Sequence, residues 1–136
     1  IVPRGRKCYC NRSGCLDTYC CASILSDFTG GDLHAFFDEM RSGKNKGLVN
    51  VFDEYMDYLA IAVNNLRMCY DCDVILGGYV GAYMSEHIEA FQTKAAELNP
   101  FEKDCSYIKV CHYKTEASAV GAAVYYIDKF VKELGE

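Results

Sequence analysis

Three cysteines near the start of the sequence have a spacing that suits metal binding. Cys8, Cys10 and Cys15 lie within eight residues of one another, with Gly14 as a hinge between them. Three thiolates this close can converge on one tetrahedral zinc ion. No histidine lies nearby in the sequence, so a fourth ligand would come from elsewhere, and a neutral imidazole would complete a stable structural site. The alternatives are three buried free thiols or a disulfide.

The remaining cysteines carry weaker signals. Cys69 and Cys72 have the spacing of a thioredoxin-like dithiol, but they follow a predicted helix whose C-terminal dipole opposes a thiolate. The pair could also unite with Cys8 and Cys10 in a second zinc half-site. Small buried side chains explain the others, which are Cys20, Cys21, Cys105 and Cys111. We therefore expect reduced thiols, some of them on metal.

Composition limits the class of protein. The chain has 136 residues, 51% of them apolar and 24% charged, which suits one globular domain. Its formal charge of -5 offers no surface for gripping phosphate backbones, so we expect DNA contact only through an additional N-terminal domain. It lacks both a run of about 20 apolar residues and a signal peptide, so we expect a cytoplasmic protein without membrane contact.

The start of the sequence predicts a piece of a larger protein. The first residue is not Met, and it stands only seven positions before the cysteine cluster. Val2 to Gly5 also match part of a protease-cleavable tag linker, which would carry no functional meaning.

Apolar residues at helical spacing predict a mainly helical chain. The strongest pattern predicts a long core helix, because apolar side chains recur there at spacings of four and three residues: Leu48, Phe52, Tyr55, Leu59, Ala62, Leu66 and Cys69. Shorter helices are expected over residues 16–25, 32–41, 81–98 and 117–134. Thr115 is the expected N-cap of the last one, and its apolar face consists of Val120, Val124, Ile127, Phe130, Val131 and Leu134.

Two short strands are expected between these helices. Residues 73–76 form a continuous apolar run that ends at Gly77 and Gly78, and residues 106–113 alternate in polarity. Because helices separate the strands, we expect a parallel pair within an α/β arrangement. Two strands make a thin sheet, which favours further strands upstream.

The cysteine cluster also carries a family resemblance. Cys8, Cys10, Gly14 and Cys15 match, at the same spacings, the motif Cys-x-Cys-Gly-x-x-Gly-Cys-x-Glu of the ROK family of bacterial repressors and sugar kinases. The similarity extends to residues 117–123 and spans nearly the whole chain. It implies a partial actin-like ATPase (ribonuclease H-like) lobe, mainly helical with a short parallel sheet remnant. Residues 1–15 would form the zinc-binding loop and residues 16–136 the C-terminal α/β lobe, without the N-terminal lobe.

Two positions depart from that motif. Asn11 replaces the first glycine, and it tolerates the left-handed conformation better than other non-glycine residues. Asp17 replaces the glutamate, which in family kinases contacts a sugar hydroxyl. Its shorter side chain would need a water bridge or a different sugar. Alternatively, Asp17 only favours the positive end of a helix.

The resemblance assigns ligands to these positions. It implies that Cys8, Cys10 and Cys15 bind a structural zinc together with a His upstream of this chain, and that Asp17 binds the sugar. Gly77 and Gly78 match the glycines near which family kinases bind the adenosine of ATP. Alone, paired glycines after a strand are more often a tight turn.

These observations lead to three hypotheses. The leading one is a fragment of a sugar-responsive transcriptional regulator, whose effector domain binds a sugar or sugar phosphate and forms a homo-oligomer. The second is the C-terminal lobe of an ATP-dependent, glucokinase-like sugar kinase, whose ATP-gripping loop and catalytic aspartate lie outside this sequence. The third is a stand-alone structural zinc module. In each case we expect no phosphoryl transfer by this chain alone.

Overall fold

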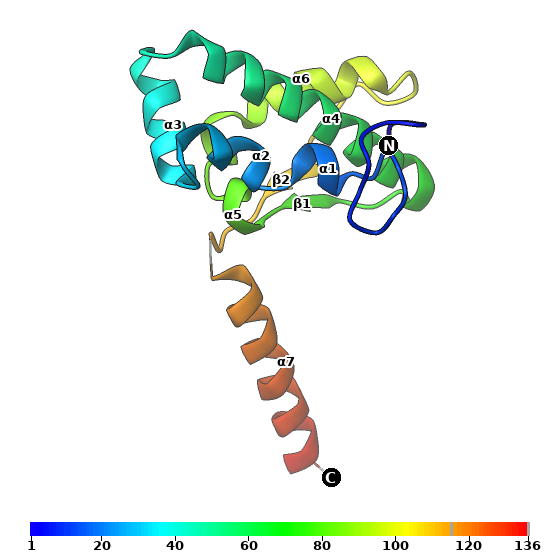
Figure 1. Cartoon of the computed structure of the whole chain (residues 1–136). Coiled ribbons are helices and arrows are strands. Elements are labelled where there is room, and N and C mark those ends of the chain that lie inside the picture. Colours follow the sequence, from blue (N-terminus) through cyan, green and yellow to red (C-terminus); the bar gives the residue numbers. More distant parts are fainter. Residues whose placement is uncertain (115, 136) are drawn as a thin grey trace.

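The computed structural model describes residues 1–114 and 116–135 and is mostly helical around a small parallel sheet. After an N-terminal loop, the elements are α1 (Asp17–Cys20), α2 (Ser23–Ser26), η1 (Asp27–Thr29), α3 (Leu33–Ser42), α4 (Lys46–Tyr70), β1 (Val74–Leu76), α5 (Gly78–Gly81), η2 (Met84–Glu86), α6 (Ile88–Leu98), β2 (Ile108–Val110) and α7 (Ala117–Leu134). Figure 1 shows α4 running along the body, with α3 at one end and the N-terminal loop at the other.

The long core helix predicted from the sequence is confirmed as α4. Its buried side chains include Leu48, Phe52 and Tyr55, and they pack with α3 and α6 into one hydrophobic core. The predicted stripe is wrong at its far end, because Leu66 and Cys69 lie on the exposed last turns.

The parallel pairing of the two strands is also confirmed. Val74 pairs with Ile108 and Leu76 with Val110, so β1 and β2 run in the same direction. Leu76 and Ile108 are buried, whereas Ile75 points to solvent. One face of the sheet therefore contacts α4 and α6, and Ile75 marks the uncovered face. The expected actin-like lobe stays a prediction.

The helix predicted over residues 16–25 is wrong, because the chain breaks at Cys21 into α1 and α2. Cys21 has extended backbone angles, φ -81° and ψ 157°. The carbonyl of Cys20 accepts a hydrogen bond of 2.9 Å from the Tyr55 hydroxyl of α4. This contact occupies an oxygen that a continuous helix would bond internally.

The helix predicted over residues 81–98 is likewise interrupted, because aromatic packing fixes a turn before α6. Tyr83 stacks on Phe37 at 4.0 Å between ring centroids, and the His87 ring meets Phe52 edge-on at 4.8 Å. His87 is not helical, with φ -120° and ψ 2°. These tertiary contacts override the helix propensity of the segment.

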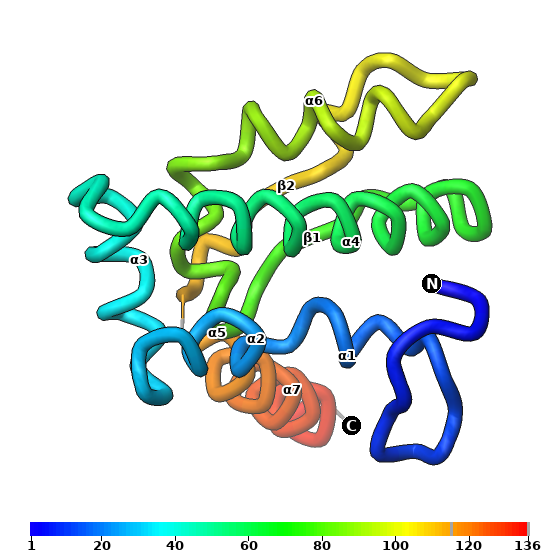
Figure 2. The backbone as a smooth tube through the Cα atoms, turned by 45° about the horizontal axis from the view of Figure 1, so that its top comes forward, coloured from blue at the N-terminus to red at the C-terminus, as the bar shows by residue number. Residues whose placement is uncertain are grey.

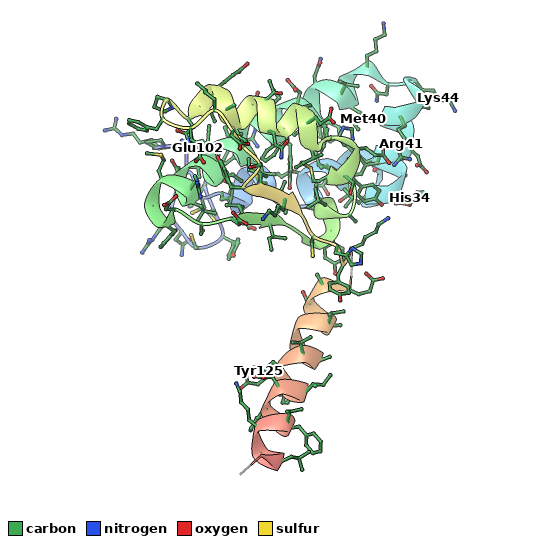
Figure 3. The ribbon with its side chains drawn as sticks, turned by 180° about the vertical axis from the view of Figure 1, so that it is seen from behind. His34, Met40, Arg41, Lys44, Glu102 and Tyr125 are labelled. Carbon is green, nitrogen blue, oxygen red and sulfur yellow. The ribbon has the colours of Figure 1, made fainter. Side chains whose placement is uncertain are left out.

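The last helix is confirmed as α7, but none of its residues is buried. Its apolar face is exposed from 59% at Val124 to 70% at Leu134, and Val120 near its start is half-buried. Figure 1 shows α7 extending away from the body, and Figure 3 shows its Tyr125 far from Glu102 and Met40. The proposed cap, Thr115, lies outside the described residues.

Candidate metal centre

The N-terminal loop is a small hairpin that presents Cys8 and Cys10 at its turn. The Cys8 N–H donates to the Arg12 carbonyl at 2.8 Å, and the Asn11 N–H donates to the Cys8 carbonyl at 3.0 Å. Lys7 and Ser13 form an antiparallel bridge below the turn. Asn11 has a left-handed φ of 64°. This is the conformation that asparagine was expected to tolerate in place of the motif's glycine.

Gly14 brings the third cysteine back toward the other two. It is buried, with φ 78°, and residue 2 crosses directly over it. The Val2 N–H donates to the Gly14 carbonyl at 3.2 Å, and the Gly14 N–H donates to the Arg6 carbonyl at 2.9 Å. A Cβ on Gly14 would overlap the Val2 carbonyl oxygen and lie 2.7 Å from its carbon. Only glycine fits here.

The three predicted cysteines form a cluster that can hold a metal ion. The Sγ atoms of Cys8, Cys10 and Cys15 all lie within 4.8 Å of one another, and those of Cys10 and Cys15 are 3.6 Å apart. A tetrahedral zinc with Zn–S bonds of about 2.3 Å requires sulfur separations of about 3.8 Å. Cys8 is buried, Cys15 half-buried and Cys10 exposed. The donor set and its spacing therefore fit zinc.

The protonation of the cluster is shared between neighbouring thiols. The backbone amide of Arg12 and the thiols of Cys15 and Cys8 hold the pKa of Cys10 below its usual range. The hydrogen bond to Cys10 and burial raise the pKa of Cys15 to about 11. The pKa values of the two thiols are therefore shifted in opposite directions by their contact. Cysteine binds a metal ion as the thiolate, so metal binding at this cluster would release protons.

Within the described residues, the cluster contains three ligand groups and no histidine. His34 pairs with Asp38 at 2.9 Å on α3, at the end of the body away from the N-terminal loop (Figures 1 and 3). His87 packs on the Phe52 ring, and His112 packs on Tyr113. The cluster thus provides three of the four ligands that a structural zinc needs.

The alternative in which Cys69 and Cys72 form a second zinc half-site with Cys8 and Cys10 is wrong. Cys69 lies in the last turn of α4 and Cys72 follows the helix, both exposed. Neither belongs to the cluster of Cys8, Cys10 and Cys15 that could hold a metal ion, so they do not share a site with Cys8 and Cys10. All nine cysteines are free thiols in the structure.

Asp17 is the first residue of α1 and is exposed, as a ligand-binding carboxylate requires. The Cys15 carbonyl accepts hydrogen bonds from both the N–H (3.2 Å) and the hydroxyl (2.8 Å) of Thr18. These bonds tie the third cysteine to the turn that carries Asp17. The side chain of Asp17 makes no ion pair or hydrogen bond within the described part of the chain.

Gly77 and Gly78 follow β1 as predicted, at its carboxyl end. Gly77 lies against Cys111, whose Cβ would be 3.4 Å from a Cβ on the glycine. Gly78 has φ 72°, and the space above it is open. Figures 1 and 2 show this end of β1 at α5, away from the N-terminal loop. The glycines therefore lie away from the N-terminal loop that carries the cysteine cluster.

A cavity of about 300 Å³ between the N-terminal loop and α4 was not predicted. Arg6, Tyr19, Glu54 and Tyr58 are among the residues that line it, and Asp17 is not. They come from three segments that no local spacing relates.

In the described part of the chain, no helix combines the length and apolarity needed to cross a membrane.

Comparison with known proteins places the chain in one family. The ROK family profile matches residues 1–129, whereas no curated protein and no solved structure matches the chain. The match covers the cysteine hairpin, the helical body, the sheet and most of α7. The chain belongs to the ROK family of repressors and sugar kinases.

Proposed function

We propose that this chain is the zinc-bearing, sugar-binding part of a ROK transcriptional regulator. The convergence of three sulfurs beside the helix turn that carries Asp17 supports this function most directly. Cys8, Cys10 and Cys15 supply three ligands to a structural zinc. The fourth is a His from a preceding segment of the whole protein, in line with a cluster of three within the described residues.

The zinc has a structural role in this proposal. A closed tetrahedral site fixes the backbone of all its ligands and needs no open position for substrate. Fixing Cys15 also fixes its carbonyl, and through Thr18 the first turn of α1. The Asp17 carboxylate then accepts a hydrogen bond from a sugar hydroxyl at a set position. Sugar or sugar phosphate is the effector, and DNA binding belongs to a separate domain.

A sugar kinase is the second candidate, favoured by the carboxyl end of β1. Gly78 adopts a positive φ with nothing above it within 4 Å, so a nucleotide can approach the backbone closely there. In that case the whole protein transfers phosphate from ATP to a sugar. A stand-alone zinc module is the third candidate, and it predicts zinc binding without sugar binding.

Replacing Asp17 by asparagine tests the sugar site. We expect the zinc-loaded protein to bind one sugar of a panel that contains glucose, N-acetylglucosamine and xylose, measured by calorimetry. Asp17→Asn should weaken binding at least about tenfold, because a hydrogen bond to a charged acceptor contributes roughly 1.5–3 kcal/mol. The control is Glu39→Gln, an exposed acid on α3. Unchanged binding by Asp17→Asn, or no binding of any sugar by the wild type, would contradict the assignment.

The same panel separates regulator from kinase. With ATP and Mg²⁺ present, the regulator predicts sugar binding by the whole protein without formation of a sugar phosphate. Formation of a sugar phosphate would establish the kinase instead.

A further inference from the structure

Tyr19 connects the N-terminal loop to the helical body through its hydroxyl. Its side chain is 4% exposed, and the hydroxyl oxygen accepts a 2.7 Å hydrogen bond from the Arg6 N–H, thirteen residues away. Gly5 leaves the room that this bond needs, because a Cβ there would overlap the hydroxyl. The backbone just before the hairpin is therefore built around this one oxygen.

The Arg6 side chain reinforces the same connection. Its guanidinium lies over the Tyr19 ring at 4.5 Å from the centroid. It also donates to the Thr18 carbonyl at 3.3 Å and to the Glu54 carboxylate of α4 at 3.2 Å. The Tyr19 ring in turn contacts the Tyr58 ring of α4, 4.3 Å away. Arg6 is thus held by both α1 and α4.

Arg6 also links the two arms of the hairpin. Its N–H is bound by Tyr19, and its carbonyl accepts the N–H of Gly14 at 2.9 Å. Cys8 follows Arg6 by two residues, and Cys15 follows Gly14 directly. The backbone of Arg6, held by the Tyr19 hydroxyl on one side and by Gly14 on the other, therefore sets the separation of Cys8 and Cys15.

We propose that Tyr19 is a positioning residue of the metal centre, whose hydroxyl holds the Cys8 and Cys15 arms at the separation that a metal ion requires. The inference rests on the proposed zinc function. Tyr19 does not touch the metal itself. It preorganises the thiolates, which lowers the ordering cost of binding in the way that outer-shell hydrogen bonds do at metal sites.

Tyr19→Phe tests this role, because it keeps the ring and removes only the hydroxyl. We expect the zinc Kd, measured by competition with a chelating dye, to rise about tenfold or more, in line with losses of outer-shell partners. The matched control is Tyr58→Phe, because no hydrogen bond of the Tyr58 hydroxyl is found among the described residues. It should leave the Kd within about twofold of wild type.

Gly5→Ala provides a second variant, since its methyl group would overlap the Tyr19 hydroxyl and crowd the Val2 side chain. It should also weaken zinc binding, and by a smaller factor when Tyr19→Phe is already present. Thermal unfolding of the metal-free variants separates this role from a general loss of stability, which would lower their Tm in proportion to the loss of affinity.

The possible outcomes distinguish the positioning role of Tyr19 from the proposed zinc centre. Wild-type protein without cysteine-bound zinc would contradict both claims. Zinc bound by wild type and by Tyr19→Phe with equal Kd, or equal weakening by Tyr58→Phe, would overturn the positioning role alone.

Discussion

Gly14→Ala is expected to abolish zinc binding at concentrations where the wild type is saturated. The new Cβ would overlap the carbonyl oxygen of Val2, and φ at this position is 78°. The left-handed conformation alone costs an alanine about 1–2 kcal/mol. The overlap is with backbone and has no flexible side chain to move. Residue 2 must leave Gly14, and the hairpin arms that place Cys8 and Cys15 separate.

Gly30→Ala is the matched control for this prediction. Gly30 has φ 67°, close to that of Gly14, but nothing lies within 4 Å of its would-be Cβ. The free energy of unfolding of Gly30→Ala should therefore fall only by the cost of placing an alanine in the left-handed conformation, and its zinc affinity should be unchanged. Zinc titration measures the affinity, and thermal unfolding followed by far-ultraviolet circular dichroism measures the stability. Equal zinc affinities of the two variants would show that the packing around Gly14 does not hold the metal centre.

Phe91→Ala is expected to lower the free energy of unfolding by about 3–5 kcal/mol, the usual effect of removing a buried phenylalanine. Phe91 is fully buried on α6, in the core that α4 and α6 share. A domain of this kind has a total stability of about 5–15 kcal/mol, so the variant loses a large share of it. Urea denaturation followed by circular dichroism gives the value.

The control removes the same side chain from α7. Phe130 is 60% exposed, so Phe130→Ala should change the free energy of unfolding by no more than about 0.5 kcal/mol. A loss similar to that of Phe91→Ala would mean that the apolar face of α7 is covered in solution.

The sequence predicted that the three cysteines meet because their positions are local. Cys8, Cys10 and Cys15 need only one hairpin and one glycine to meet, and their spacing records that geometry. The core of α4 was equally predictable, since its stripe repeats over many turns. Both features depend on neighbours in the chain.

Features that depend on distant residues were missed. The break at Cys21 follows from the Tyr55 hydroxyl, which bonds the carbonyl of Cys20, 35 residues away, and no local pattern reveals this contact. The Arg6 to Glu54 contact, 48 residues apart, joins the N-terminal loop to α4 in the same way. Tyr19 fell within the helix predicted over residues 16–25, and nothing in the sequence distinguished it. Its partner, a backbone N–H, leaves no trace in residue types.

The proposed zinc centre is tested most directly by the metal content of the purified whole protein, combined with X-ray absorption at the zinc edge. We predict one zinc per chain, bound by three sulfurs at about 2.3 Å and one lighter ligand, with Cys8, Cys10 and Cys15 protected from thiol reagents until a chelator is added. Substoichiometric zinc, or free reactivity of Cys8 and Cys10 in the zinc-loaded protein, would contradict the account.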